Sequence, residues 1–240
     1  MGPAPAAPAA DGAAVTSALR LLQVGDSMLP VGSFSFSSAL EPAIQAGVVH
    51  DTATLRDFVR TTTHRAATSD GIALLAAHRA ARAGDHELLL AADRAVLARK
   101  LNEEMRTQST RMGKKLVEVG VTVVGSPLVA GWLDLIGHGT APGTYPVALG
   151  LVCAELDLPE QEAFAVHQYG AAMTVLGAAL RLMRVDHLAT QQILFEVNAR
   201  VGDDHAEVER AALSDMATFA PMVDVLAAAH VRSHIRMFMN

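Results

Sequence analysis

Apolar residues recur along most of the chain at the spacing of amphipathic helices. In the longest such tract, from residue 87 to about 119, they stand three, four or seven residues apart and share one stripe: Leu97, Leu101, Met105, Met112, Leu116 and Val119. Shorter tracts predict helices over residues 16–24, 51–68, 71–83, 146–156, 160–183, 189–198, 207–217 and 222–238. Strand patterns are scarce, and the β-branched run 121–124 is isolated, which favours a helix end or a connector over a strand. The sequence therefore predicts a single all-α, helical-bundle-like domain over residues 15–240.

Residues typical of helix ends support several of these bounds. Asp51 stands at the N-cap position before a stripe formed by Leu55, Phe58 and Val59. Gly84 closes the helix expected over 71–83, and residues 137–144 (GHGTAPGT) form the clearest loop. Residues 1–14, rich in proline, alanine and glycine, are expected to be a disordered tail. They lack the basic start and long apolar run of a signal peptide.

The stretch 29–47 (LPVGSFSFSSALEPAIQAG) has an unusual pattern for a helical chain. Phe34 and Phe36 alternate with serines, as in a short strand. Pro30 and Gly32 stand just before them and favour an ordered loop instead. Ser38 and Glu41 have the spacing of a capping box, which predicts a helix from about residue 38 to Gly47. The expected structure is a loop that leads directly into a short helix.

Composition and charge exclude several classes of partner. The 240 residues are 51% hydrophobic and 18% charged, with a net charge of −6. An acidic chain lacks the basic face that nucleic acid requires. The single cysteine, Cys153, excludes an intramolecular disulfide and multi-cysteine metal sites, which favours a cytoplasmic protein. Such an apolar chain is expected to bury part of its surface against other subunits.

Residues 163–180 carry no formal charge over eighteen positions, close to the minimum for a membrane span. His167 and Gln168 lie inside this segment, and small residues dominate it, so we expect a core or interface helix and no membrane span. Gly170 and Gly177 would let another backbone approach closely. This helix is therefore the predicted contact of a homodimer.

Motifs for catalysis are missing from the sequence. The segment Gly113-Lys114-Lys115 lacks the leading glycine and the hydroxyl residue of a phosphate-binding loop. The serines near Gly32 lack the closing glycine of a nucleophile elbow. Cys153 lies in an apolar helical stretch, where a buried, inert thiol is expected. We therefore expect no enzymatic activity and no cofactor.

One histidine pair and one arginine pair could have a chemical role. His230 and His234 are four residues apart and would share one side of a helix, but two imidazoles without a nearby carboxylate or thiolate make a poor metal site. No metal site is therefore predicted. Arg106 and Arg111 have the character of a solvated helix face, with glutamates and lysines around them. An arginine inserted in trans into a phosphoryl-transfer site is the alternative.

Four segments, in order along nearly the whole chain, resemble a known family. They are residues 21–51 (LLQVGDSMLPVGSFSFSSALEPAIQAGVVHD), 104–113 (EMRTQSTRMG), 145–150 (YPVALG) and the ending from His230 through Arg236, Met237 and Phe238. Each is similar to a motif of the urease accessory protein UreF family. The chain departs from the family pattern at Phe36, where tyrosine is usual, and at Ala39, Asp186, His187 and Val231.

This resemblance implies a helical, usually dimeric and non-catalytic chaperone. Members of the family bridge the accessory protein UreD (also called UreH) and the GTPase UreG, in a complex that delivers nickel to the urease apoprotein. The opening loop would be a rigid recognition feature with its phenylalanines as anchors. Residues 229–240 would be a partner-binding tail that docks on UreD/UreH through Phe238.

The resemblance assigns partner binding to Pro30, Gly32, Phe34, Ser35, Glu41, Arg106, Ser109, His230, Arg236 and Phe238. Two alternatives remain open at this point. The chain could carry nickel itself through His230, His234 and His138. It could also regulate the partner GTPase by presenting Arg106 or Arg111 to the nucleotide.

Overall fold

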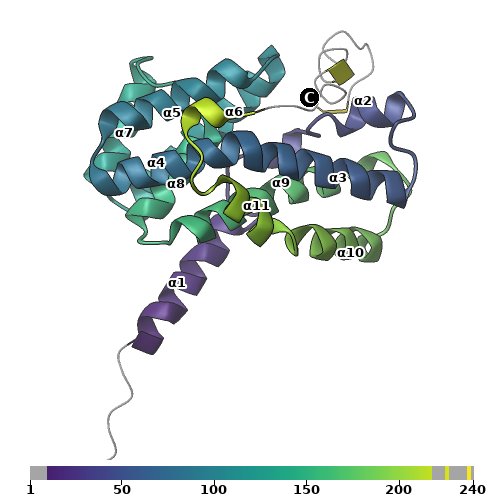
Figure 1. Cartoon of the computed structure of the whole chain (residues 1–240), viewed down its shortest axis with the longest axis horizontal. Coiled ribbons are helices and arrows are strands. Elements are labelled where there is room, and N and C mark those ends of the chain that lie inside the picture. Colours follow the sequence, from purple (N-terminus) through teal and green to yellow (C-terminus); the bar gives the residue numbers. More distant parts are fainter. Residues whose placement is uncertain (1–9, 218–224, 227–236, 239–240) are drawn as a thin grey trace, which may run out of the picture.

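The computed structural model describes residues 10–217, 225–226 and 237–238 (Figure 1). Within these residues every regular element is helical, which confirms the predicted all-α class. The helices are α1 (Ala10–Gly25), α2 (Leu40–Gln45), α3 (Thr52–Ala66), α4 (Ile72–Ala83), α5 (His86–Arg99), α6 (Glu103–Val123), α7 (Pro127–Gly137), α8 (Tyr145–Glu155), α9 (Glu160–Leu182), α10 (His187–Asn198) and α11 (Val201–Val208). Short 3₁₀ turns lie at Ser33–Ser35 and Leu213–Asp215, and a π-helical turn lies at Ala67–Gly71.

The helices pack around two adjoining hydrophobic clusters. In the first, α4 packs against α5 and α8, and α8 packs against α6. In the second, α9 packs against α2, α3 and α10. Helix α1 contacts α9 near its own C-terminal end and projects away from the body of the protein (Figure 1).

Helix α9 corresponds to the uncharged segment considered above. By length and composition it is the one described helix that meets the criteria for crossing a membrane. In the fold, 56% of its most apolar window is buried against the rest of the chain. Its contacts with α3, α8 and α10 make it a core helix. A core helix is apolar over most of its surface, so it can meet the length and composition criteria for a membrane span without being one.

Local capping signals predicted some helix ends and were missed at others. Asp51 accepts a hydrogen bond from the Thr54 N–H at 2.8 Å and caps α3, as predicted. Gly84 follows α4 with φ of +69°, the left-handed conformation that glycine adopts without strain. The single helix predicted over 87–119 is wrong, because Asn102 accepts from the Met105 N–H at 2.8 Å and begins a new helix. Residues 121–124 end that helix, as expected.

Other predicted bounds also differ from the structure. Helix α1 begins at Ala10, inside the tail predicted over 1–14, because the last proline is Pro8 and alanines favour a helix after it. Helix α7 was not predicted, although Ser126 and Pro127 form a typical start. The helix predicted over 207–217 is wrong, because α11 ends at Val208 and only the 3₁₀ turn Leu213–Asp215 follows it in that range. Most of the helix predicted over 222–238 lies outside the described residues.

The opening stretch is an ordered loop, as predicted, but its capping box is wrong. Gly32 turns the chain with φ of +80°, and the 3₁₀ turn Ser33–Ser35 follows. Ser38 and Ala39 both have positive φ, and α2 begins only at Leu40. The N-cap position of this helix is therefore Ala39, one residue after Ser38, and Ala39 has no side-chain oxygen with which to cap it. The Ser37 hydroxyl oxygen accepts from the Glu41 N–H instead, at 3.4 Å.

Two buried contacts fix the start of α8. The Asp93 carboxylate, fully buried on α5, accepts hydrogen bonds from the Gly143 and Thr144 N–H groups, each at 2.7 Å. On the other side, Gly113 of α6 approaches so closely that a Cβ there would lie 2.1 Å from the Gly143 carbonyl oxygen. The loop before Tyr145 is therefore held between α5 and α6, and Tyr145 has a defined position.

Candidate functional site

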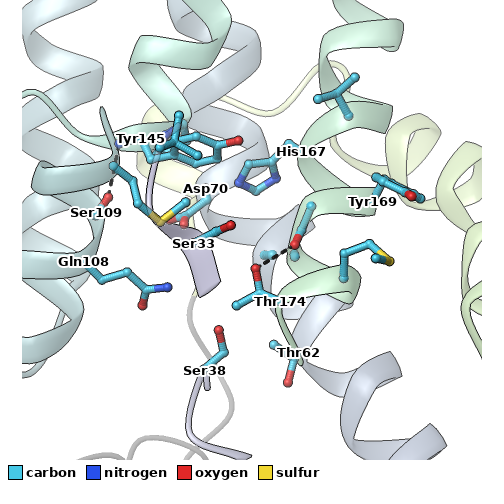
Figure 2. Close-up of a pocket in the computed structure, with 18 of the residues that line it drawn as sticks. Ser33, Ser38, Thr62, Asp70, Gln108, Ser109, Tyr145, His167, Tyr169 and Thr174 are labelled. Atoms are coloured by element: carbon cyan, nitrogen blue, oxygen red, sulfur yellow. Dashed lines mark hydrogen bonds between the residues drawn. The ribbon is translucent and has the colours of Figure 1, made fainter. Parts of the chain in front are cut away.

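Three of the four motif segments meet around one cavity of about 350 Å³ (Figure 2). The opening loop, α6, the start of α8 and the inner face of α9 all contribute to its wall. Figure 2 shows Ser33 and Ser38 of the loop, Gln108 and Ser109 of α6, Tyr145 of α8 and His167 of α9 around it. Because these segments are far apart in the sequence, their convergence makes this cavity the candidate functional site.

An ion pair and a neutral histidine lie in the cavity wall. The Lys100 ammonium is 2.8 and 2.6 Å from the two carboxylate oxygens of Asp70. Burial alone would raise the pKa of Asp70, but the nearby positive charge and hydrogen bond of Lys100 hold it below its usual value. Burial lowers the pKa of His167 to about 4. At neutral pH this wall therefore carries a charged Asp70–Lys100 pair and an uncharged imidazole.

The π-helical turn between α3 and α4 places Asp70 in this wall. A π turn disturbs the regular i→i−4 hydrogen bonds and needs other partners for its backbone groups. With its amide nitrogen toward Thr63, the buried Gln168 side chain donates to the Thr63 carbonyl at 2.8 Å and accepts from the Ala67 N–H at 3.2 Å. His167 therefore lines the cavity, whereas the adjacent Gln168 contacts the π turn.

Phe34 lies exposed on the rim of the cavity. Its side chain is 72% exposed, whereas Phe36 is buried in the core. The alternation of the two phenylalanines therefore reflects one ring facing solvent and one facing the interior, without a strand. Pro30 is exposed on the same loop, and Gly32 and Ser35 are partly exposed. These positions make the predicted loop residues accessible to a partner.

Met237 and Phe238, near the end of the chain, lie against the start of α2 and the end of α9. The Glu41 carboxylate accepts hydrogen bonds from the backbone N–H groups of Met237 and Phe238, at 2.8 and 3.0 Å. The Phe238 side chain is 5% exposed and belongs to the second hydrophobic cluster. The sequence predicted Phe238 as an anchor for UreD/UreH, but in this chain the ring is buried by the chain itself. Glu41, also a predicted partner contact, is buried as well, and its carboxylate binds these backbone groups of the chain itself.

Arg181, at the end of α9, was missed by sequence reasoning. Its Nη2 donates to the Phe34 carbonyl at 3.0 Å, and its guanidinium carbon lies 4.3 Å from the centre of the Phe238 ring. It is the first charged residue after the uncharged segment 163–180. That position could have identified Arg181 from the sequence, because a charged residue next to a long uncharged segment often lies where the segment meets solvent.

The predicted residues of α6 have different environments. Ser109 is buried and its hydroxyl oxygen accepts from the Tyr145 N–H at 3.3 Å, so it supports the cavity wall from within the fold. Arg106 is exposed, and its Nε donates to the Lys100 carbonyl at 2.8 Å. The remaining predicted partner residues, His230 and Arg236, lie outside the described residues.

Gly170 and Gly177 line the cavity side of α9. A Cβ at either position would meet no other heavy atom of the described chain within 4 Å. The close approach that these glycines permit is therefore not used between the described elements. This face of α9 is left open toward the cavity.

Of the three histidines in the nickel-carrier alternative, the structure describes only His138. His138 is exposed, with its Nδ1 2.8 Å from the Asp134 carbonyl oxygen, and His234, like His230, lies outside the described residues. Among the described residues, donor atoms of His64, Asp204 and Glu207 lie within 4.8 Å of one another. Sequence reasoning missed this group because His64 is on α3 and the carboxylates are on α11.

Comparison with known proteins gives a consistent result. The family profile described as UreF matches residues 49–198. The chain is 55% identical over 222 residues to "Urease accessory protein UreF 2" of Brucella canis, covering 92% of this chain and 91% of that protein. It is 50% identical over 222 residues to "Urease accessory protein UreF" of Yersinia pseudotuberculosis, covering 92% and 97% respectively.

The fold and the cavity define an all-helical protein with an exposed aromatic rim, and these relatives are named as accessory proteins. The chain belongs to the UreF family of urease accessory proteins. This membership confirms the resemblance drawn from the four sequence segments and assigns the chain a role in urease maturation.

Proposed function

We propose that this chain is a non-catalytic, cytoplasmic scaffold that bridges UreD/UreH and the GTPase UreG during nickel delivery to the urease apoprotein. The observation that carries the proposal is the exposure of Phe34 on an ordered loop beside the cavity. Gly32 and the 3₁₀ turn Ser33–Ser35 fix this loop, and the Arg181 guanidinium holds its backbone. A rigid, exposed aromatic side chain is typical of the few residues that dominate protein–protein binding.

A bridging protein needs a second surface, and α1 offers one. Val15, Leu19 and Leu22 are exposed on α1 and are spaced by four and three residues, so they share one apolar stripe. Helix α1 projects from the body (Figure 1), and its last residue, Gly25, lines the cavity. The stripe and Phe34 thus provide two apolar surfaces, one for each of two partners.

We also propose a homodimer in which the open face of α9 is covered by a second copy. The support is the unused space beside Gly170 and Gly177, which permits close backbone packing. Gly177→Leu is expected to leave the monomer folded, because a Cβ there meets no described atom within 4 Å and the side chain can extend into the cavity, and to weaken the dimer. Light scattering at micromolar concentration measures this, and an unchanged dimer in the variant, or a strict monomer in the parent, would refute the assignment.

The bridging proposal is tested by co-purification with UreD/UreH and with UreG separately. Phe34→Ala is expected to weaken binding to one partner by at least about tenfold, the size typical of a dominant interface residue. Phe195→Ala is the matched control, since Phe195 is 80% exposed on α10, outside the cavity lining. If Phe34→Ala retains the parental affinity for both partners, Phe34 is not a recognition residue and the proposal loses its main support.

A double variant, Leu19→Ser with Leu22→Ser, examines the α1 stripe in the same assay. It should weaken binding to the partner that Phe34→Ala leaves unaffected. Loss of binding to the same partner in both variants would show one combined surface and would overturn the two-surface arrangement.

A further inference from the structure

We propose that Arg181 is a positioning residue that couples the C-terminal end of the chain to the exposed loop, so that docking of Phe238 fixes the position of Phe34. The coupling involves only residues of this chain and requires no bound partner. Its consequence for partner binding rests on the proposed function.

The first half of the coupling is the contact between Arg181 and the loop. The Nε of Arg181 donates to the Gly177 carbonyl at 3.1 Å, one turn earlier on α9, and Nη2 donates to the Phe34 carbonyl at 3.0 Å. The guanidinium is planar and rigid, so one hydrogen bond to its own helix orients the group that holds Phe34. The loop backbone is therefore positioned from the core helix α9.

The second half is the contact between the same guanidinium and Phe238. The ring centre lies 4.3 Å from the guanidinium carbon, within the range of a cation–π contact. The ring therefore contacts the side chain that holds the loop. Phe238 is buried, so its position is set by packing as well as by this contact. Removing the ring would free one side of the guanidinium and allow it to leave the Phe34 carbonyl.

Glu41 closes the arrangement from the other end of the loop. Its carboxylate accepts from the N–H groups of Met237 and Phe238, and its own N–H donates to Ser37, which directly follows Phe36. The C-terminal residues are thus held by α2, which follows the loop, and by α9, whose Arg181 binds the loop. The loop and residues 237–238 are therefore expected to hold each other in place, because α2 and Arg181 contact both.

Hydrogen exchange of the full chain, measured by mass spectrometry, tests the coupling without any partner. The reporters are the Ser35 and Phe36 N–H groups, which donate to the Gly32 and Ser33 carbonyls. Phe238→Leu, which keeps an apolar side chain but removes the ring, should speed their exchange about three- to tenfold, the scale of one cation–π contact. Arg181→Gln should have a similar effect, and Phe195→Ala should have none.

The double variant, Phe238→Leu with Arg181→Gln, distinguishes coupling from two separate effects. If Arg181 transmits the effect of Phe238, the double variant exchanges no faster than Arg181→Gln alone. Multiplying effects, or an unchanged loop in Phe238→Leu, would overturn the proposal. Exchange in α4 and α8 serves as the control for global unfolding, and it should match the parent in every variant.

The outcome for partner binding is separable from this result. Phe238→Leu should lower affinity for the partner that contacts Phe34, by less than Phe34→Ala does. If loop exchange responds as expected while Phe34→Ala binds both partners normally, the coupling stands and the proposed role of Phe34 fails. If loop exchange is unchanged while Phe34→Ala loses a partner, the coupling fails and the proposed function stands.

Discussion

The carboxylate of Glu41 accepts a hydrogen bond from the backbone N–H of Phe238 at 3.0 Å, across a separation of 197 residues. The adjacent Met237 N–H binds the other carboxylate oxygen at 2.8 Å. Two successive N–H groups on one buried carboxylate form a charge-assisted pair, stronger than hydrogen bonds between neutral groups. One residue of the opening motif therefore holds the end of the chain.

Glu41→Gln tests this contact. A glutamine offers one acceptor oxygen, so one of the two N–H groups loses its partner, and we expect a loss of about 1–3 kcal/mol in the free energy of unfolding. Urea unfolding measures the loss, and hydrogen exchange should locate it at the C-terminal amides. Glu196→Gln is the control, because its half-exposed ion pair with Arg56 contributes about 0–1 kcal/mol. Equal unfolding curves for parent and Glu41→Gln would contradict the assignment.

The limits of sequence reasoning are visible at the same residue. Asp51 and Gly84 were predicted because their partners lie within a few residues, so the local pattern contains the whole signal. The spacing of Ser38 and Glu41 fitted a capping box equally well, but the Glu41 carboxylate binds residues at the other end of the chain. Asp93 and Gly113 likewise depend on the loop before α8, about 50 and 30 residues away, and no local pattern reveals them.

The candidate site was predictable in part for the same reason. The motif segments were identified from the sequence, and Phe34 was predicted as an accessible anchor. Their arrangement around one cavity depends on the packing of α6, α8 and α9, which periodicity alone does not determine. Ser109 and Phe238 lie within the motif segments, and both are buried in the fold. A motif match does not tell whether a side chain faces a partner or the core, so the sequence could not separate these two residues from Phe34.

Two glycine substitutions should have opposite effects on stability. Gly113→Ala places a Cβ 2.1 Å from the Gly143 carbonyl oxygen, so the backbone must move, and we expect a loss of at least about 1–3 kcal/mol. In the monomer, the Cβ of Gly177→Ala meets no described atom within 4 Å, so at a protein concentration below dimerisation this variant should gain about 0.5–1 kcal/mol from helix propensity. Urea unfolding of both variants measures the difference. A Gly113→Ala protein as stable as Gly177→Ala would show that α6 and the loop are not tightly packed.

His167 should make stability depend on pH. Burial lowers its folded-state pKa to about 4, whereas the unfolded value is 6.5; Asp70 opposes this shift and Lys100 adds to it. As the pH falls below 6.5 the unfolded chain gains a proton that the folded chain does not, so stability is lost between about pH 6.5 and 4 and not further below. This contribution is on the order of 3 kcal/mol. His167→Gln should lose less stability over that window in acid-titrated urea unfolding, and parallel pH profiles for the two proteins would contradict the prediction.

Cys153 should be unreactive in the folded protein. Burial, with a smaller contribution from the charge of Glu162, raises the pKa of its thiol to about 12, and the thiolate is the reactive form. At pH 8 we expect the native protein to react with a thiol reagent at least about a hundredfold more slowly than the chain unfolded in guanidinium. Because the chain has no second cysteine, the unfolded protein is its own control. Comparable rates in the two states would show that α8 opens readily.

Arg106→Ala should leave the fold intact while impairing urease activation. Arg106 is exposed on α6, and its Nε donates a 2.8 Å hydrogen bond to the Lys100 carbonyl. Loss of that exposed contact should cost no more than about 1 kcal/mol, the scale of a single net hydrogen bond. Any large defect in activation would therefore come from recognition, since the residue lies in a family-like motif beside the cavity-lining Met105.

Urease activity of cells that carry the variant measures activation, and circular dichroism with urea unfolding checks the fold. Thr122→Ala, near the other end of α6, is the control for a general effect on this helix, since its hydroxyl makes one contact with the Glu118 carbonyl. Normal urease activity in Arg106→Ala would make the residue a solvated surface residue, whereas lost activity with a parental unfolding curve would place it on a partner surface.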